Sequence, residues 1–283
     1  SFTGPYAGGT FESRPEHALN GNGQGLVIGN EFELVFSSED QAKELPKRAQ
    51  MFQRDPTAFA SPEWNAGSGA LGKMAGIDRK TFPQMEAAIE QGYLSHTRCV
   101  ERGNEYGMWN YANTHTYWNA ADNCADLHRV WHNSHYHEVG NTWQMVYRSG
   151  SPDLLRWARK STDHFMNVAT VNYAEFNPDG RPKLKFHALG AMNHCKGLTV
   201  WGGETYGMVR RDGHAGVGGH WIDPDAFLWD WYLTGNDRAW DVYKMWAESY
   251  ARWPWYGGTR REANTTLACM LNYYRASWDP NML

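Results

Sequence analysis

Apolar residues recur every three or four positions over much of the chain beyond residue 40. The spacing is clearest in residues 78–104, where the apolar positions are Phe82, Met85, Ile89 and Tyr93. Gly103 follows them, and glycine commonly caps the last turn of a helix. This spacing predicts an amphipathic helix that buries one face against the rest of the molecule.

The first forty residues have a different pattern. Residues 25–38 partly alternate polar and apolar side chains and are punctuated by glycine, which predicts one or two strands. Ser38 is expected to cap the helix that follows, and Pro46 to start or interrupt it. We therefore expect a β segment and linker that ends a β-domain, residues 1–40, and a helical catalytic domain, residues 41–283, as part of a longer protein.

The helical part contains an internal repeat. Residues 134–161 and 219–246 align without gaps at an offset of 85 positions, so that His135 falls on His220. Further aligned pairs are Tyr136 with Trp221, Tyr147 with Tyr232, Ser149-Gly150 with Thr234-Gly235, and Leu155 with Trp240. A third, partial copy aligns Tyr274 with Tyr232, 42 positions later.

Each copy predicts a helical hairpin. The first helix ends at a Tyr-x-Ser/Thr-Gly turn, and the second, antiparallel helix begins near Pro152 or Asp237. Long insertions at residues 103–127 and 174–218 favour a toroid, whose loops gather at one mouth, over an open solenoid. We therefore expect a mainly α fold: an α/α toroid, as an incomplete barrel of antiparallel helical hairpins, after a short β segment.

The extent of the chain bears on this toroid. A closed ring would need more helices than the three copies supply. Either the ring is incomplete, or the native protein continues beyond residue 283.

The composition argues for some classes of binding partner and against others. The formal net charge is −4 with no basic stripe, which argues against nucleic acid, and no apolar run is long enough to span a membrane. The chain has 15 Trp, 15 Tyr and 11 Phe, which could be platforms for sugar rings or filling for a helical core. Its 4 cysteines form no CxxC pair, which excludes a zinc ribbon.

Histidine and tyrosine are the candidate acid–base groups. The repeat places His135 and His220 at equivalent positions, and Tyr136 follows the first of them. Such side chains can take a proton from a substrate and return one to a leaving group. Sequence alone leaves open which of them is the base and which the acid.

Arginines and aromatic residues complete the candidate site. Arg210 and Arg211 lie in a Gly-rich stretch and have the shape to hold a carboxylate through two hydrogen bonds, with His194 in support. The expected substrate-binding residues are Trp109, Trp118, Trp201, Trp221, His115 and Tyr117.

Together these groups match β-elimination from a uronic acid unit. The enzyme must neutralise the C6 carboxylate, remove the C5 proton and protonate the leaving O4. The sequence therefore predicts a secreted or periplasmic polysaccharide lyase whose partner is an acidic polysaccharide or oligosaccharide.

Other chemistries stay open at this point. A glycoside hydrolase on the same scaffold would use Asp223 or Asp225 with Glu204, and a glycan-binding or surface-assembly module would use the aromatic residues alone. His132, His135 and His137 could ligate zinc, but positions i and i+2 diverge on a helix, and no metal site is predicted. No cofactor is identified, and a structural Ca²⁺ stays open.

The repeat copies also resemble a known family. Three features carry the resemblance: turns at Arg148-Ser149-Gly150 and Leu233-Thr234-Gly235-Asn236, the stretch Thr162-Asp163-His164 followed by Asn167-Val168, and the stretch from Gly219-His220-Trp221 to Asp230-Trp231-Tyr232. Over about residues 100–250 they resemble the C-terminal α/α toroid of the exo-rhamnogalacturonan lyase-like (YetA-like) polysaccharide lyase family.

The resemblance implies a lyase that acts on an acidic polysaccharide such as pectic rhamnogalacturonan or an algal polyuronate. This chain departs from the family pattern in two ways. Asn167 stands where an Asp is expected, and the N-terminal β-domains of the family are nearly absent.

Overall fold

The fold is mainly helical, as the apolar spacing predicts. A computed structural model describes residues 27, 29, 32–53, 57–103, 118–119, 124–125, 137–170, 172–173, 178, 200–201, 204–205, 224–252 and 260–282. Among these residues, no helix is long and apolar enough to cross a membrane.

The described helices, in chain order, are η1 (Gln41–Glu44), α2 (Leu45–Gln53), α3 (Pro62–Ser68), α4 (Pro83–Gly103), α5 (Glu138–Ser149), α6 (Pro152–His164), its π-helical extension η3 (Phe165–Ala169), α7 (Asp225–Thr234), α8 (Asp237–Arg252), α9 (Arg260–Ser277) and η5 (Pro280–Met282). Two short antiparallel ladders accompany them: β1 (Trp118–Asn119) with β2 (Cys124–Ala125), and β3 (Val200–Trp201) with β4 (Glu204–Thr205). The amphipathic helix predicted within residues 78–104 is confirmed as α4.

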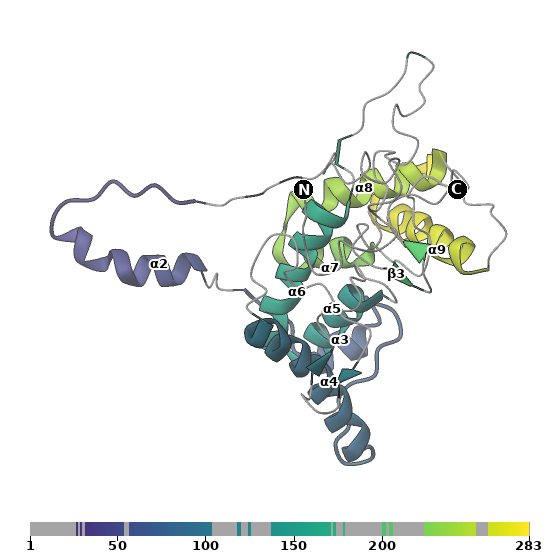
Figure 1. The fold of residues 1–283 in the computed structure, drawn as a ribbon, viewed down its shortest axis with the longest axis horizontal. Helices are drawn as coiled ribbons and strands as arrows, with labels where there is room; N and C mark the ends of the chain where they lie inside the picture. The colour runs from purple at the N-terminus through teal and green to yellow at the C-terminus, as the bar shows by residue number, and fades with distance from the viewer. Residues whose placement is uncertain are drawn as a thin grey trace.

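Residues 32–53 form an arm that extends from the helical body (Figure 1). Residues 32–38 have no regular secondary structure and belong to no ladder among the described residues, so the predicted strand is not found there. Pro46 is the second residue of α2, where its missing N–H is tolerated. An ion pair between Arg48 and Glu33 joins residues 32–38 to α2.

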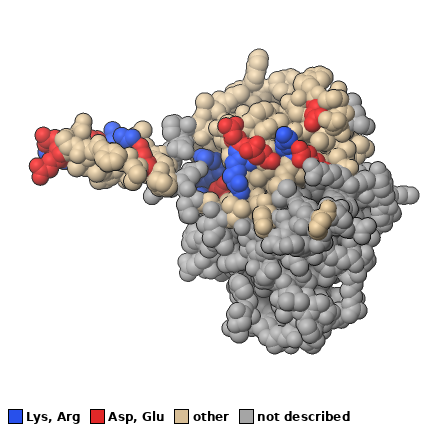
Figure 2. Space-filling model, turned by 90° about the horizontal axis from the view of Figure 1, so that it is seen from above, with Lys and Arg blue, Asp and Glu red and all other residues tan. Residues whose placement is uncertain are grey.

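The described surface carries charges of both signs. Figure 2 shows Lys and Arg interspersed with Asp and Glu on the arm and on the visible face of the body. This mixture matches the small net charge of the chain and supplies no basic stripe among the described residues of that face.

The two hairpins of the repeat are confirmed in atomic detail. Gly150 and Gly235 end α5 and α7 with φ of 65° and 71°, left-handed values that glycine adopts without strain. Ser149 donates to the Met145 carbonyl at 2.6 Å, and Thr234 donates to the Asp230 carbonyl at 2.8 Å. The same turn chemistry therefore closes both hairpins.

The third copy is present, but one position away from the predicted alignment. Ser277 donates to the Tyr273 carbonyl at 2.8 Å and accepts from the Asp279 N–H at 3.1 Å, as Ser149 and Thr234 do in their turns. Trp278 then takes the left-handed position of the glycine, with φ of 59°. Ser277, and not Ala276, is therefore the counterpart of Thr234.

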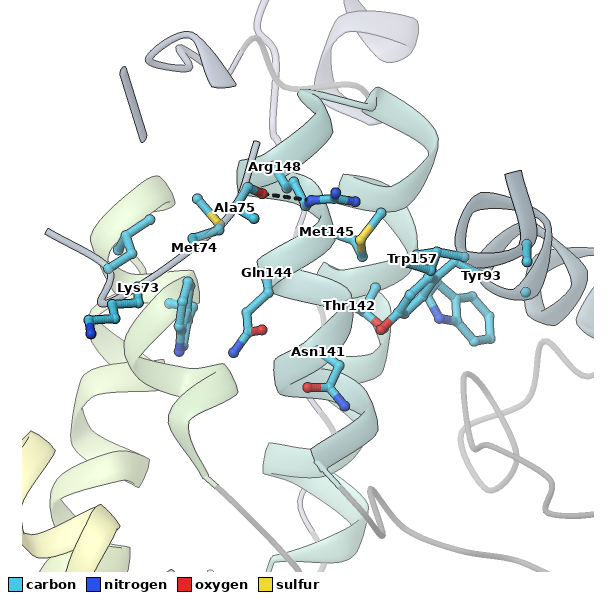
Figure 3. A pocket seen from close by; sticks show the side chains of 15 residues that line it. Lys73, Met74, Ala75, Tyr93, Asn141, Thr142, Gln144, Met145, Arg148 and Trp157 are labelled. Atoms are coloured by element: carbon cyan, nitrogen blue, oxygen red, sulfur yellow. Dashed lines mark hydrogen bonds between the residues drawn. The ribbon is translucent and has the colours of Figure 1, made fainter. Parts of the chain in front are cut away.

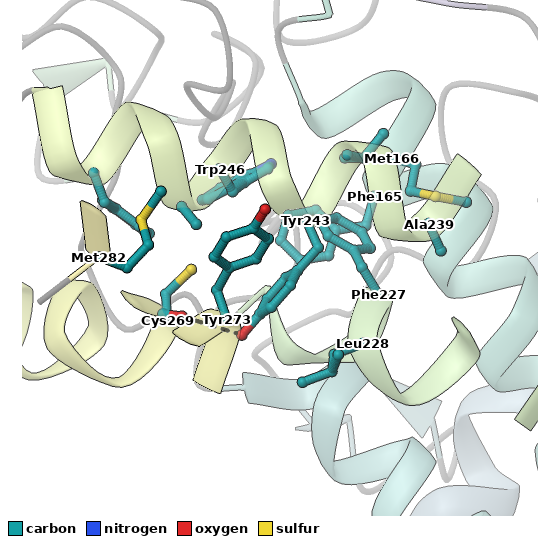
Figure 4. Close-up of a cluster of buried hydrophobic side chains, with 13 residues drawn as sticks. Phe165, Met166, Phe227, Leu228, Ala239, Tyr243, Trp246, Cys269, Tyr273 and Met282 are labelled. Carbon is teal, nitrogen blue, oxygen red and sulfur yellow. Dashed lines mark hydrogen bonds between the residues drawn. The ribbon is translucent and has the colours of Figure 1, made fainter. Parts of the chain in front are cut away.

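Buried aromatic side chains form the core between these hairpins. One cluster joins η3, α7, α8 and α9, with Phe227, Tyr243 and Trp246 fully buried (Figure 4). The other cluster lies around α5 and α6. The indole N–H groups of Trp143 and Trp246 donate to Thr162 and Thr170, at 2.8 and 3.0 Å. These tryptophans thus belong to the core with satisfied polar atoms.

Successive hairpins pack on one another. Helix α5 contacts both α6 and α7, α7 contacts α8, and α8 contacts α9. This arrangement is compatible with the predicted α/α toroid, which stays a prediction.

Candidate functional site

The sequence-predicted site residues lie almost entirely outside the described part of the chain. The residues outside it are His135, Tyr136, His194, Arg210, Arg211, His220, Trp109, His115, Tyr117 and Trp221. Trp118 and Trp201 lie in β1 and β3, where only the backbone is described. Their roles stay predictions, but the points at which their segments join the helical body are described.

Those segments are two long connections that attach at neighbouring points. Residues 104–136 connect α4 to α5, and residues 171–223 connect η3 to α7. The structure describes only a few positions in each connection. Val139 at the start of α5 and Ala226 at the start of α7 belong to one buried cluster. Trp143 of α5 donates a hydrogen bond to Thr162 near the end of α6, and the rings of Phe165 in η3 and Phe227 in α7 have centroids 4.6 Å apart. The start of α5, the end of α6 and the start of α7 therefore meet at one place, the convergent end.

The backbone is strained where the first connection reaches the convergent end. His137 precedes α5 with φ of 62° and ψ of 23°, a left-handed conformation that residues with a Cβ adopt infrequently. Backbone strain of this kind concentrates at functional sites. This strain makes the start of α5 a candidate for function.

Asp225 ties three helices together at the start of α7. One carboxylate oxygen accepts from the Tyr243 hydroxyl of α8 at 2.5 Å, and the other accepts from the Asn272 amide of α9 at 2.7 Å. Both oxygens are thus engaged by the fold. This geometry favours a structural role for Asp225 over the acid or nucleophile of a glycosidase.

A pocket of about 650 Å³ lies along one face of α5. Asn141, Gln144, Met145 and Arg148 line it and follow one another at helical spacing. Helix α4, residues 71–75, Trp157 of α6 and Trp229 of α7 supply the other walls (Figure 3). We call this cavity the α5 pocket.

Arg148 holds one wall of the α5 pocket in place. Its guanidinium forms a two-point ion pair with Glu86 of α4, and both side chains are largely buried. It also donates to the carbonyls of Ala75 at 2.7 Å and Gly76 at 3.1 Å. Hydrogen bonds from Arg148 and from the Asp78 N–H lower the pKa of Glu86. Arg148 is therefore a neutralised structural clamp.

A second buried carboxylate, Asp230, stabilises the α7–α8 turn. Its oxygens accept from Thr234 at 3.1 Å and from Asn236 at 2.7 Å. Burial nevertheless raises the pKa of Asp230, because desolvation outweighs these hydrogen bonds. Burial also raises the pKa of Tyr147, whose hydroxyl donates to the Trp229 carbonyl at 2.9 Å. Both groups are therefore engaged by hydrogen bonds within the fold.

Among the described residues, no group of three or more His, Cys, Asp or Glu side chains is placed to hold a metal ion.

No family model matches this chain, but it has a distant relative among known proteins. The chain is similar to YetA of Bacillus subtilis strain 168. The two are 26% identical over 228 residues, which is 77% of this chain and 23% of YetA. The chain thus spans less than a quarter of the length of YetA. This similarity confirms the YetA-like part of the expected resemblance, but YetA is described as an uncharacterized protein, so neither the lyase family nor an activity follows from it.

Sequence reasoning missed the α5 pocket. The spacing of Asn141, Gln144 and Arg148 was visible as one polar stripe on a predicted helix. The opposite walls come from residues 71–75 and from α4, which lie some fifty or more positions earlier in the chain. No local sequence pattern predicts that these segments pack against the polar stripe of α5.

Proposed function

We propose that this chain is the helical part of a polysaccharide lyase that cleaves a uronate-containing polysaccharide by β-elimination. One observation carries the proposal: both connections that contain the candidate catalytic residues attach at the convergent end. Segments tethered at one place can present His135, Tyr136 and His220 to the same substrate. The resemblance of the repeat copies to the polysaccharide lyase family adds support.

The proposed reaction consumes no water and needs no redox partner. Arg210 and Arg211 neutralise the C6 carboxylate, which makes the C5 proton more acidic. A His or Tyr base removes that proton, and its electron pair forms the C4–C5 double bond. The C4–O4 bond breaks, and a second His or Tyr side chain protonates the departing oxygen.

A hydrolase is less well supported by the described residues. It would need two carboxylates on either side of the scissile bond, one of them able to donate a proton. Asp225 has both oxygens engaged by Tyr243 and Asn272. A lyase, by contrast, needs no free carboxylate.

The proposal is tested by incubating the protein with a panel of polyuronates. A lyase produces unsaturated uronate, which absorbs in the ultraviolet, together with new reducing ends. Reducing ends without unsaturated product would identify a hydrolase and overturn the proposal. Glycan binding without either product would identify a binding module and would also overturn it.

The proposed substrate also sets an expected location. Polyuronates lie outside the cytoplasm, so we propose a secreted or periplasmic protein. Fractionation of the source cells, with detection by an antibody, tests this expectation.

A further inference from the structure

We propose that the α5 pocket is a binding subsite for an acidic saccharide, in which Lys73 pairs with a uronate carboxylate. This inference rests on the proposed function for its substrate class. It adds a binding site and a cationic residue that are not among the predicted catalytic residues. It also gives the direction in which a bound saccharide would run.

The charges of the α5 pocket point to an anionic ligand. Lys73 and Arg148 are the two cationic side chains that line it. Glu86 neutralises Arg148 through the two-point ion pair. Lys73 is exposed, and its ammonium group has no hydrogen-bond or ion-pair partner in the part of the chain that the structure describes. The pocket therefore keeps one uncompensated positive charge.

The segment that carries Lys73 is fixed rather than free. Arg148 holds the carbonyls of Ala75 and Gly76, two and three positions further along. Gly72, on the other side of Lys73, has φ of 82° and makes the tight turn that presents it. Because the backbone is held on both sides, a ligand does not have to order it.

The remaining lining suits a sugar better than a purely apolar ligand. Trp229 packs on Tyr147 with ring centroids 5.3 Å apart and also lines the pocket, as an aromatic wall. Gln144 is exposed and, in Figure 3, extends from α5 toward the side where Lys73 lies. Amides that bond hydroxyl groups, beside an aromatic surface and a cation, match an acidic saccharide.

Size and position agree with this ligand. The volume of 650 Å³ falls within the range of about 300–1,000 Å³ typical of ligand sites. Asn141, at one end of the pocket, lies one helical turn after His137, where the first connection reaches the convergent end. A saccharide in the pocket would therefore lead toward the segment that contains His135 and Tyr136.

Calorimetric titration tests the subsite. The probes are trimers of galacturonate, guluronate, mannuronate and glucuronate, with maltotriose as the neutral control. We expect at least one acidic trimer to bind more tightly than maltotriose. Lys73→Gln should weaken that affinity about fivefold, in line with about 1 kcal/mol for an exposed ion pair. Lys73→Arg should keep most of it.

Lys80→Gln is the matched control, because Lys80 is also exposed but does not line the pocket. It should leave the affinity unchanged. Equal loss in Lys73→Gln and Lys80→Gln, no loss in Lys73→Gln, or no binding of any acidic trimer would each overturn the subsite.

The same samples separate this inference from the proposed function. Binding that depends on Lys73, without unsaturated product from any polyuronate, would leave the subsite standing and remove the lyase. Unsaturated product together with full affinity in Lys73→Gln would support the lyase and overturn the subsite.

Discussion

Gly235 shows how much one residue can contribute when its backbone conformation is unusual. Its φ of 71° favours glycine, and an added Cβ would meet no atom within 4 Å, so the cost of alanine there is purely conformational. Gly235→Ala should lower the free energy of unfolding by about 1–2 kcal/mol. Gly140 lies inside α5 with equally open surroundings, so Gly140→Ala should raise it by up to about 1 kcal/mol.

Urea unfolding followed by circular dichroism measures both variants. The two substitutions are chemically identical, so opposite signs isolate the backbone conformation as the cause. Equal effects of the same sign would contradict the assigned left-handed turn.

Glu86 and Asp230 should give opposite dependences of stability on pH. The pKa of Glu86 is lowered in the folded state, so its contribution is present above the ordinary carboxyl pKa and is lost as pH falls. The pKa of Asp230 is raised by burial, so its ionised form opposes folding and the protein gains from protonating it as pH falls.

The measurement is the free energy of unfolding of the unmutated protein minus that of Glu86→Gln or Asp230→Asn, from neutral pH to about pH 4. The first difference should shrink as pH falls, and the second should move in favour of the unmutated protein. Parallel trends for the two variants would show that one of these environments is wrongly assigned.

At the scale of elements, phenylalanine contributes very differently to stability in the core and on the arm. Phe227 is fully buried against Phe165, whereas Phe36 on the arm is 94% exposed. Phe227→Ala should cost about 3–5 kcal/mol, and Phe36→Ala should have no measurable effect. Thermal unfolding of both variants checks this, and a large loss in Phe36→Ala would mean that the arm packs on something.

Helices and hairpin turns were predictable because their signals are local. The turn at Gly150 needs only a Ser or Thr, a glycine and a following helix start, and all lie within a few positions. The third turn was predicted one position too early. The left-handed position that Gly150 and Gly235 hold in the other turns is held there by Trp278, so no glycine marks it in the sequence. The strand expected within residues 25–38 was not found in its described part, because a strand also requires a partner.

At the scale of the whole molecule, the repeat does more than build two hairpins. It singles out His135 from the four histidines in residues 128–137, because that one alone has a counterpart, His220. The convergent end brings the segments of both copies to the same part of the body. Segments that attach at one place can present both duplicated histidines to one substrate, as the acid and the base of the proposed reaction.

His220→Ala should therefore lower the rate of unsaturated product formation by about 10²–10⁴-fold, the usual loss when an acid–base group is removed. His128→Ala is the matched control, since His128 has no counterpart in the second copy, and it should keep the rate of the unmutated protein. Both variants must first show unchanged circular dichroism. Full activity in His220→Ala, measured on the best polyuronate of the panel, would remove the repeat-based choice of catalytic residues.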